Sequence, residues 1–159
     1  MDTVSLTNTG ETDMQTLIIT RADLDDTNTY VGATDVSDFA GHIEIAANLG
    51  HVHFTGSLRA AGSVRALAGS GIKAGEGIKA GEGIEAGSGI EAGWGIKAGW
   101  GIKAGLSVSA KFVAVRLRIF AGLCLWRQPT REEMQIRAEV RSGTVAFGEV
   151  VAPVETAVE

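Results

Sequence analysis

Residues 71–106 of the chain read GIKAGE GIKAGE GIEAGS GIEAGW GIKAGW GIKAGL, a six-residue word repeated six times. Each word holds an isoleucine and, two positions later, an alanine, with a lysine or a glutamate between them. Because side chains two positions apart in an extended segment point to the same side, the isoleucine and alanine should face a core together. A helix is excluded, since two glycines in each word would cost on the order of 2 kcal/mol per word relative to alanine. The stretch therefore predicts short strands separated by glycine turns.

The six-residue spacing of inward aliphatic residues extends beyond the perfect words. These residues are Val52, Leu58, Val64, Ile72, Ile78, Ile84, Ile90, Ile96, Ile102 and Val108, with one break, a spacing of eight, between Val64 and Ile72. One such unit cannot bury its apolar side alone, whereas stacked units bury it against one another. We therefore expect an all-β protein built on a short parallel β-solenoid.

The period and the inward aliphatic resemble those of the left-handed hexapeptide-repeat proteins, over residues 52–112. The resemblance implies triangular coils of three words each. The chain departs from the family's word at its last position, where the family prefers a small or β-branched residue and this chain has, for example, Glu76 and Trp94.

The outward charges do not fix the coil size. Coils of eighteen residues place Lys73 beside Glu91 but leave Lys79 beside Lys97, two like charges. Coils of twelve residues would alternate the sign of every neighbour. Because opposite charges on neighbouring strands contribute only about 0.2–1 kcal/mol per pair, both coil sizes stay open.

Three segments are expected along the chain. Residues 1–42 are polar and should form an arm and adaptor, residues 43–112 the β-solenoid, and residues 113–159 a C-terminal β segment with a tail. Alternating patterns predict one strand within residues 111–126 and another within 134–141, and Ser142-Gly143 is suited to a hairpin turn. An antiparallel cap of this kind would cover the last sheet edge of the solenoid.

Composition limits the classes of function. The 159 residues carry a net charge of −5, which argues against a general nucleic-acid binder. The single cysteine, Cys124, cannot form an internal disulfide and is expected to be a small core residue. No signal-peptide pattern and no long apolar run occurs, so a cytoplasmic protein without membrane contact is expected.

His42, His51 and His53 are the only histidines, and His51 and His53 should project from one strand face. Zinc commonly takes such pairs, and hexapeptide-repeat carbonic anhydrases bind metal through histidines at subunit interfaces. These histidines, however, precede the regular coils, and no further residue completes an obvious site. They are weak metal candidates, and neither a cofactor nor a catalytic residue is expected.

Trp94 and Trp100 replace glutamate or serine at the last position of otherwise unchanged words, and Leu106 follows them there. These three residues should form an apolar band on the later coils, suited to anchoring a protein partner. Glu76 and Glu82 occupy the same word position in earlier coils and could supply an acidic rim for a basic partner. The alternatives are that the tryptophans pack under the C-terminal segment or at a symmetric self-contact.

The preferred hypothesis is a non-enzymatic interaction protein. Its repeat style resembles that of small bacteriophage and mobile-element proteins, which would imply an accessory protein that blocks a host factor, such as an anti-CRISPR inhibitor of a defence complex. One alternative is a self-assembling structural protein similar to bactofilins, which would be a homo-oligomer. Another is a hexapeptide-repeat enzyme with an interface metal site at His51 and His53.

Overall fold

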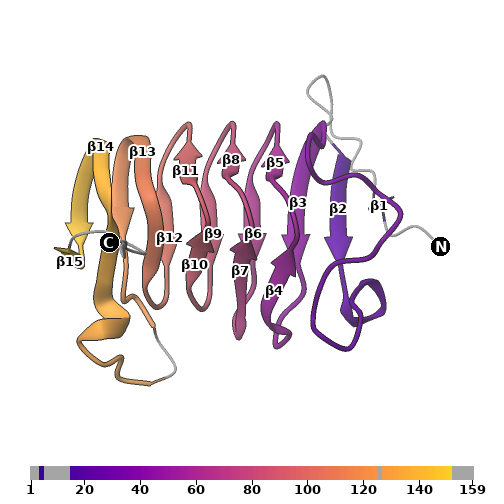
Figure 1. Cartoon of the computed structure of the whole chain (residues 1–159), viewed down its shortest axis with the longest axis horizontal. Coiled ribbons are helices and arrows are strands. Elements are labelled where there is room, and N and C mark those ends of the chain that lie inside the picture. Colours follow the sequence, from indigo (N-terminus) through magenta and orange to yellow (C-terminus); the bar gives the residue numbers. More distant parts are fainter. Residues whose placement is uncertain (1–3, 6–14, 125–126, 152–159) are drawn as a thin grey trace, which may run out of the picture.

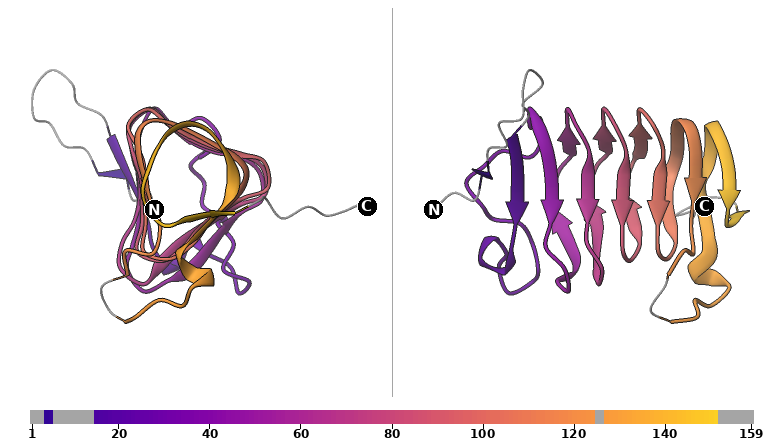
Figure 2. Two further views of the ribbon diagram at one scale, coloured as in Figure 1. Left: turned by 90° about the vertical axis from the view of Figure 1, so that its left-hand side faces the viewer. Right: turned by 180° about the vertical axis from the view of Figure 1, so that it is seen from behind.

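The chain winds into an all-β parallel solenoid whose coils stack along one axis (Figure 1). The computed structural model describes residues 4–5, 15–124 and 127–151. A view along the axis shows that successive coils superpose around a common core (Figure 2). Each regular coil contributes one strand to each of three parallel stacks, which we call faces A, B and C.

The three faces follow one another in every coil. Face A stacks β4 (Gly50–Phe54), β7 (Ser70–Ala74), β10 (Ile90–Ala92) and the start of β13 (Val108–Phe120). Face B stacks β5 (Leu58–Ala60), β8 (Ile78–Ala80), β11 (Gly95–Ala98) and the middle of β13. Face C stacks β2 (Gln15–Ile19), β3 (Gly41–Ile45), β6 (Val64–Ala66), β9 (Ile84–Ala86), β12 (Ile102–Ala104) and the end of β13.

The register establishes a coil of eighteen residues in the regular region. Ile72 pairs with Ile90, and Ile90 pairs with Val108, so equivalent residues of successive coils lie eighteen apart. The twelve-residue alternative is therefore wrong. The preceding coil is longer, because Val52 pairs with Ile72, and the additional residues form the turn before Ser70.

The core is a set of stacked columns of the two apolar residues of each word. The isoleucines of the words are at most 1% exposed, and the alanines that follow them are at most 6% exposed. Burying one such isoleucine contributes roughly 1.5–3 kcal/mol. The inward direction of both residues, predicted from the period of two, is confirmed.

The glycines at positions 81 and 83, which flank Glu82 in one turn, have different roles. A Cβ on Gly81 would lie 2.2 Å from the carbonyl oxygen of Ala61 in the preceding coil, so the first glycine permits close backbone approach. A Cβ on Gly83, the second glycine of that turn, would meet its nearest atom, the Gly101 carbonyl oxygen, at an ordinary 3.6 Å. Neither glycine has a positive φ, so a left-handed backbone conformation is not the reason for glycine at these two positions.

The solenoid begins earlier than the predicted boundary at residue 43. β2 pairs in parallel with β3, and β1 (Val4–Ser5) adds antiparallel to β2. The segment between β2 and β3 contains η1 (Arg21–Asp23) and reaches face A through a bridge of Thr29 to His53. It reaches face B through a bridge of Phe39 to Ala60. Part of the predicted adaptor is therefore an irregular first coil.

Asn28 fastens this first coil to the next one. Its side-chain Nδ2 donates to the carbonyl oxygens of Leu49 and His51, both at 2.8 Å, and its backbone is left-handed with φ 65°. Asp25 accepts from the backbone N–H groups of Thr27 and Thr29, which holds the pKa of its carboxyl below the ordinary value. The acidic residues of this loop thus stabilise turns.

The C-terminal segment continues the parallel solenoid, so the predicted antiparallel cap is wrong. β13 runs along all three faces, β14 (Gln135–Phe147) pairs with it in parallel, and β15 (Glu149–Val151) pairs in parallel with β14. Ser142-Gly143 is not a hairpin turn but lies inside β14, where Gly143 has φ 103°. A period of two predicts a strand without specifying the direction of its partner, which is why the sequence misled here.

The strand predicted within residues 111–126 ends at Phe120, and a loop follows. Leu117 is 61% exposed because β13 turns a corner there. Cys124, expected in a strand core, is half-buried outside any strand.

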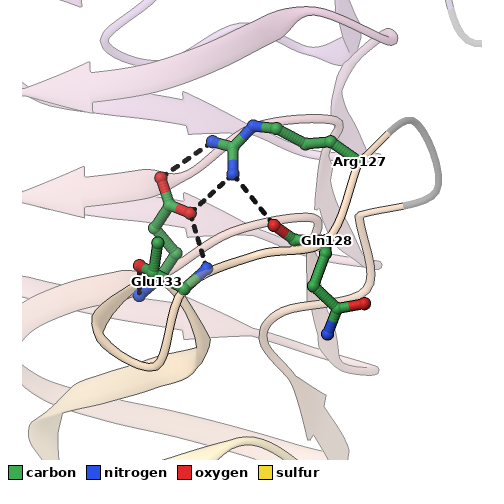
Figure 3. A network of polar contacts seen from close by, with 4 residues as sticks. Arg127, Gln128 and Glu133 are labelled. Atoms are coloured by element: carbon green, nitrogen blue, oxygen red, sulfur yellow. Dashed lines mark hydrogen bonds and ion pairs between the residues drawn. The ribbon is translucent and has the colours of Figure 1, made fainter.

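An ion pair closes the loop before β14 (Figure 3). Arg127 makes two contacts to Glu133, Nη1 to Oε1 at 2.7 Å and Nη2 to Oε2 at 2.8 Å. The Thr130 N–H also donates to Glu133, at the start of η2 (Glu132–Met134). These bonds lower the pKa of Glu133 to about 2, with the Arg127 hydrogen bond as the largest cause.

No helix among the described residues is long and apolar enough to cross a membrane.

Candidate protein-binding surface

The last residues of the words lie at the three corners of the coil. Backbone hydrogen bonds from N–H to the carbonyl of the coil before stack them into three columns, which are Gly56–Glu76–Trp94, Gly62–Glu82–Trp100 and Ser70–Ser88–Leu106. Trp94 lies between faces A and B, Trp100 between B and C, and Leu106 between C and A. The predicted single apolar band is therefore wrong, because successive words turn by one corner each.

Both tryptophans are largely exposed. Trp94 is 58% and Trp100 is 55% exposed, whereas Leu106 is half-buried. The described part of the C-terminal segment leaves more than half of each ring accessible. Trp94 and Trp100 border the same face, face B, from its two sides.

Trp94 is anchored at one edge by its neighbours. Its ring packs edge-on against Phe112, with centroids 6.0 Å apart and an interplanar angle of 87°. Lys111 Nζ lies 5.9 Å from the centroid of the Trp94 ring. These contacts orient the ring while leaving more than half of its surface accessible.

Face B carries an outward column of three cations. Arg59 pairs in register with Lys79, and Lys79 with Lys97, and all three side chains are exposed. None of the three forms an ion pair with another described residue within 4.0 Å. Like charges directly opposite on neighbouring strands are destabilising, so this column is unfavourable for the fold alone.

The other two faces alternate charge at the same word position. On face A, Lys73 lies opposite Glu91. On face C the column reads Glu44, Arg65, Glu85 and Lys103. Arg65 Nε and Glu85 Oε1 are 3.4 Å apart. The unbroken positive column is therefore a property of face B.

A groove runs along face B beside the Trp94 corner. Its volume is about 540 Å³, its floor is Gly77 and Gly95, and Glu76 and Trp94 form its corner wall. The opposite wall is the cation column of Arg59, Lys79 and Lys97. We call it groove B.

Phe112 closes the C-terminal end of groove B. It pairs in register with Gly95, and its ring covers that glycine, where a Cβ would lie 2.1 Å from the ring. The guanidinium of Arg141 lies 3.9 Å and the Lys97 ammonium 5.9 Å from the ring centroid. The sequence did not predict this role of Phe112. Ile96 pairs with Val113, which is seventeen residues later and not eighteen, and this shorter coil is visible only in the strand register.

A related groove lies beside the Trp100 corner on face C. Its volume is about 480 Å³, and Trp100 and Leu117 line it together with Arg65, Glu85 and Lys103. Its charged wall contains the Arg65–Glu85 ion pair, so the two grooves have similar shapes and different electrostatics.

The predicted rim residues lie next to the tryptophans. Glu76 stacks beneath Trp94, and Glu82 beneath Trp100, on the two corners that border face B. The Ser57 hydroxyl donates to Glu76 Oε1 at 3.0 Å, which holds that carboxylate at the N-terminal end of groove B.

The three histidines do not converge. His51 and His53 project outward from face A, whereas His42 lies on face C, where its Nδ1 accepts from the Ser63 N–H at 3.0 Å. Burial lowers the pKa of His51 below its ordinary value, against the opposing effect of Glu91. Within the described residues no three histidine, cysteine, aspartate or glutamate side chains are grouped to hold a metal ion.

No family model, curated protein or solved structure matches this chain. The resemblance to hexapeptide-repeat proteins stays a prediction from the repeat.

Proposed function

We propose that the protein is a non-enzymatic interaction protein that binds a protein partner through face B and its two tryptophan corners. The observation that carries this proposal is the exposure of Trp94 and Trp100 on the two corners of one face. The same word position holds glutamate in the preceding coil, so the fold itself does not demand an aromatic residue there.

Physical considerations support the role of these two side chains. A tryptophan offers a large apolar surface with few rotatable bonds, so it loses little conformational entropy when a partner covers it. The solenoid corners also fix both side chains on one rigid frame. Residues of this kind supply a large share of the binding free energy at protein interfaces.

The test is an affinity pull-down from a bacterial lysate, with the wild-type chain compared to W94A/W100A. A control variant, Val31→Ser, changes another large apolar side chain that is 60% exposed, in the first coil, where the Val31 N–H donates to the Asp23 carbonyl. We expect the partner to be recovered with the wild type and with Val31→Ser, and to be lost with the double variant. Equal recovery of the partner with all three proteins would contradict binding through Trp94 and Trp100.

The biological role proposed for this interaction is inferred from the repeat style only. A phage accessory protein that blocks a host defence complex fits a rigid rod without an obvious catalytic centre, and this remains our working hypothesis. Glu76 and Glu82 taken alone would favour a basic partner.

Self-assembly is a second candidate function, favoured by one observation at the C-terminal end. β15 pairs with β14 only over Gln135–Arg137, so the rest of β14 has no further described strand beyond it. Phe147, at the end of β14, is 41% exposed. An exposed strand edge can template pairing with another copy. Light scattering distinguishes this candidate, since one small defined oligomer over a range of concentrations would eliminate a polymer.

A further inference from the structure

The charge of the partner can be inferred from the outward columns of the three faces. Face A places Lys73 opposite Glu91, and face C alternates sign over four coils, which gives attraction between neighbouring coils. Face B instead repeats a cation in three successive coils, at Arg59, Lys79 and Lys97. Since a glutamate at position 79 would make the signs of this column alternate, the repeated cation lowers the stability of the fold and is not required for stacking the coils.

The column is also placed to act on a ligand. The three cations form one wall of groove B, and Trp94 with Phe112 supplies an apolar surface across it. Neighbouring coils are about 4.8 Å apart, so three cations span roughly 10 Å along the axis. Alternate side chains of an extended peptide recur about every 6.8 Å, and flexible lysine side chains can reach two or three of them.

Groove B has the dimensions of a channel for an extended chain. Its lining includes the backbone of Gly77, which has no side chain, and the ring of Phe112 lies over Gly95 and closes its C-terminal end. A Cβ on Gly77 would lie 3.3 Å from the Gly95 carbonyl oxygen, a contact that a small shift relieves. A glycine at position 77 leaves this part of groove B without a side chain.

We propose that the partner presents an extended acidic segment, which lies along the solenoid axis in groove B with its carboxylates on Arg59, Lys79 and Lys97 and an apolar side chain against Trp94. This inference rests on the proposed function and specifies the chemistry of the partner at the same surface.

An acidic protein segment fits the surface better than a nucleic acid does. Nucleic-acid binding draws on many phosphate contacts, and here three cations face Glu76 and Glu82 on the bordering corners. The chain as a whole carries a net charge of −5. A short acidic segment can place all its carboxylates on the three cations. A long polyanion would extend beyond them and be repelled by the negative charge of the rest of the chain.

The first experiment measures fluorescence anisotropy of a fluorescein-labelled peptide, GELELEG, titrated with the full chain at low ionic strength. We compare K79A/K97A with K73A/K103A, which removes the same two charges from the same word position on faces A and C. We expect K79A/K97A to weaken binding about tenfold, as two charge contacts of up to about 1 kcal/mol each allow, and K73A/K103A to weaken it less than about twofold. Added salt should weaken the wild-type complex.

Three results would overturn the inference: no binding of the acidic peptide to the wild type, equal weakening by the two double variants, or tighter binding of a ten-nucleotide oligothymidine than of the peptide. The pull-down separates this inference from the proposed function. Retention of the partner by K79A/K97A and its loss by W94A/W100A would contradict the acidic segment alone. Retention by both variants would contradict both proposals.

Discussion

Lys79 and Lys97 occupy directly opposed positions on adjacent coils of face B, and Arg59 continues the same column. The corresponding positions of face A place Lys73 against Glu91. One repeat thus produces two faces with alternating charge and one with a single sign. The difference gives a direct way to separate residues that serve the fold from residues that serve binding.

Lys79→Glu should stabilise the protein. The substitution replaces two like-charge neighbours by two opposite-charge neighbours, which should raise the free energy of unfolding by about 1 kcal/mol and Tm by about 2–4 °C. The matched control is Lys73→Glu on face A, which places two glutamates opposite each other and should lower Tm. Thermal unfolding at low salt measures both, and a lower Tm for Lys79→Glu would contradict the assigned register.

Gly81→Ala and Gly83→Ala should differ sharply although they lie two residues apart. A Cβ at position 81 would lie 2.2 Å from a carbonyl oxygen of the coil before, whereas at position 83 the nearest atom is 3.6 Å away. We expect Gly81→Ala to cost about 2 kcal/mol or more and Gly83→Ala to stay within about 1 kcal/mol of the wild type. Urea unfolding of the two variants measures this, and equal costs would contradict the close approach of the coils.

The carboxyl of Glu133 should titrate near pH 2. Since this pKa of about 2 lies below the ordinary 4.5, the ion pair with Arg127 stabilises the loop above pH 4.5. That contribution should be lost progressively as the pH falls from 4.5 toward 2. The amide proton of Thr130, which donates to Glu133, reports the titration by NMR. Arg127→Gln should move the midpoint toward 4.5, and a wild-type midpoint already near 4.5 would argue against the pair.

His51 should titrate below its ordinary value of 6.5, because burial on face A disfavours its charged form. The unfolded chain then binds a proton that the folded chain does not, so stability should fall as the pH drops below 6.5 toward the pKa of the folded state. Glu91 opposes this effect, so Glu91→Gln should lower the pKa of His51 further. NMR of the ring protons measures the pKa in both proteins, and a rise in Glu91→Gln would contradict the assigned cause.

The inward positions of the solenoid were predictable from the sequence because their identity hardly varies. Ile72, Ile90 and Val108 recur at a fixed spacing, and a period of two specifies which side they face. The triangular coil could be inferred from the family resemblance, but the charges alone favoured a smaller coil. An eighteen-residue coil places Lys79 opposite Lys97, and this like-charge pair argued against the correct coil size. The same pair lies in the candidate binding site.

The ends of the rod could not be predicted in the same way. The first coil is held by irregular contacts such as the Asn28 side chain on the Leu49 and His51 carbonyls, which leave no period in the sequence. The parallel direction of β14 relative to β13 is a matter of long-range pairing, which local patterning does not encode. Trp94 and Phe112 likewise contact each other across two coils of different length, so the regular repeat does not predict their contact.

The most direct test of the account is site-specific photo-crosslinking from one coil. Glu91, Lys97 and Lys103 occupy the same word position on faces A, B and C, so a benzophenone amino acid at each samples one face with matched chemistry. In a bacterial lysate, we predict one specific protein adduct from position 97 and little or none from positions 91 and 103. Equal yields from the three positions, or an adduct from 91 or 103 without one from 97, would contradict binding through face B.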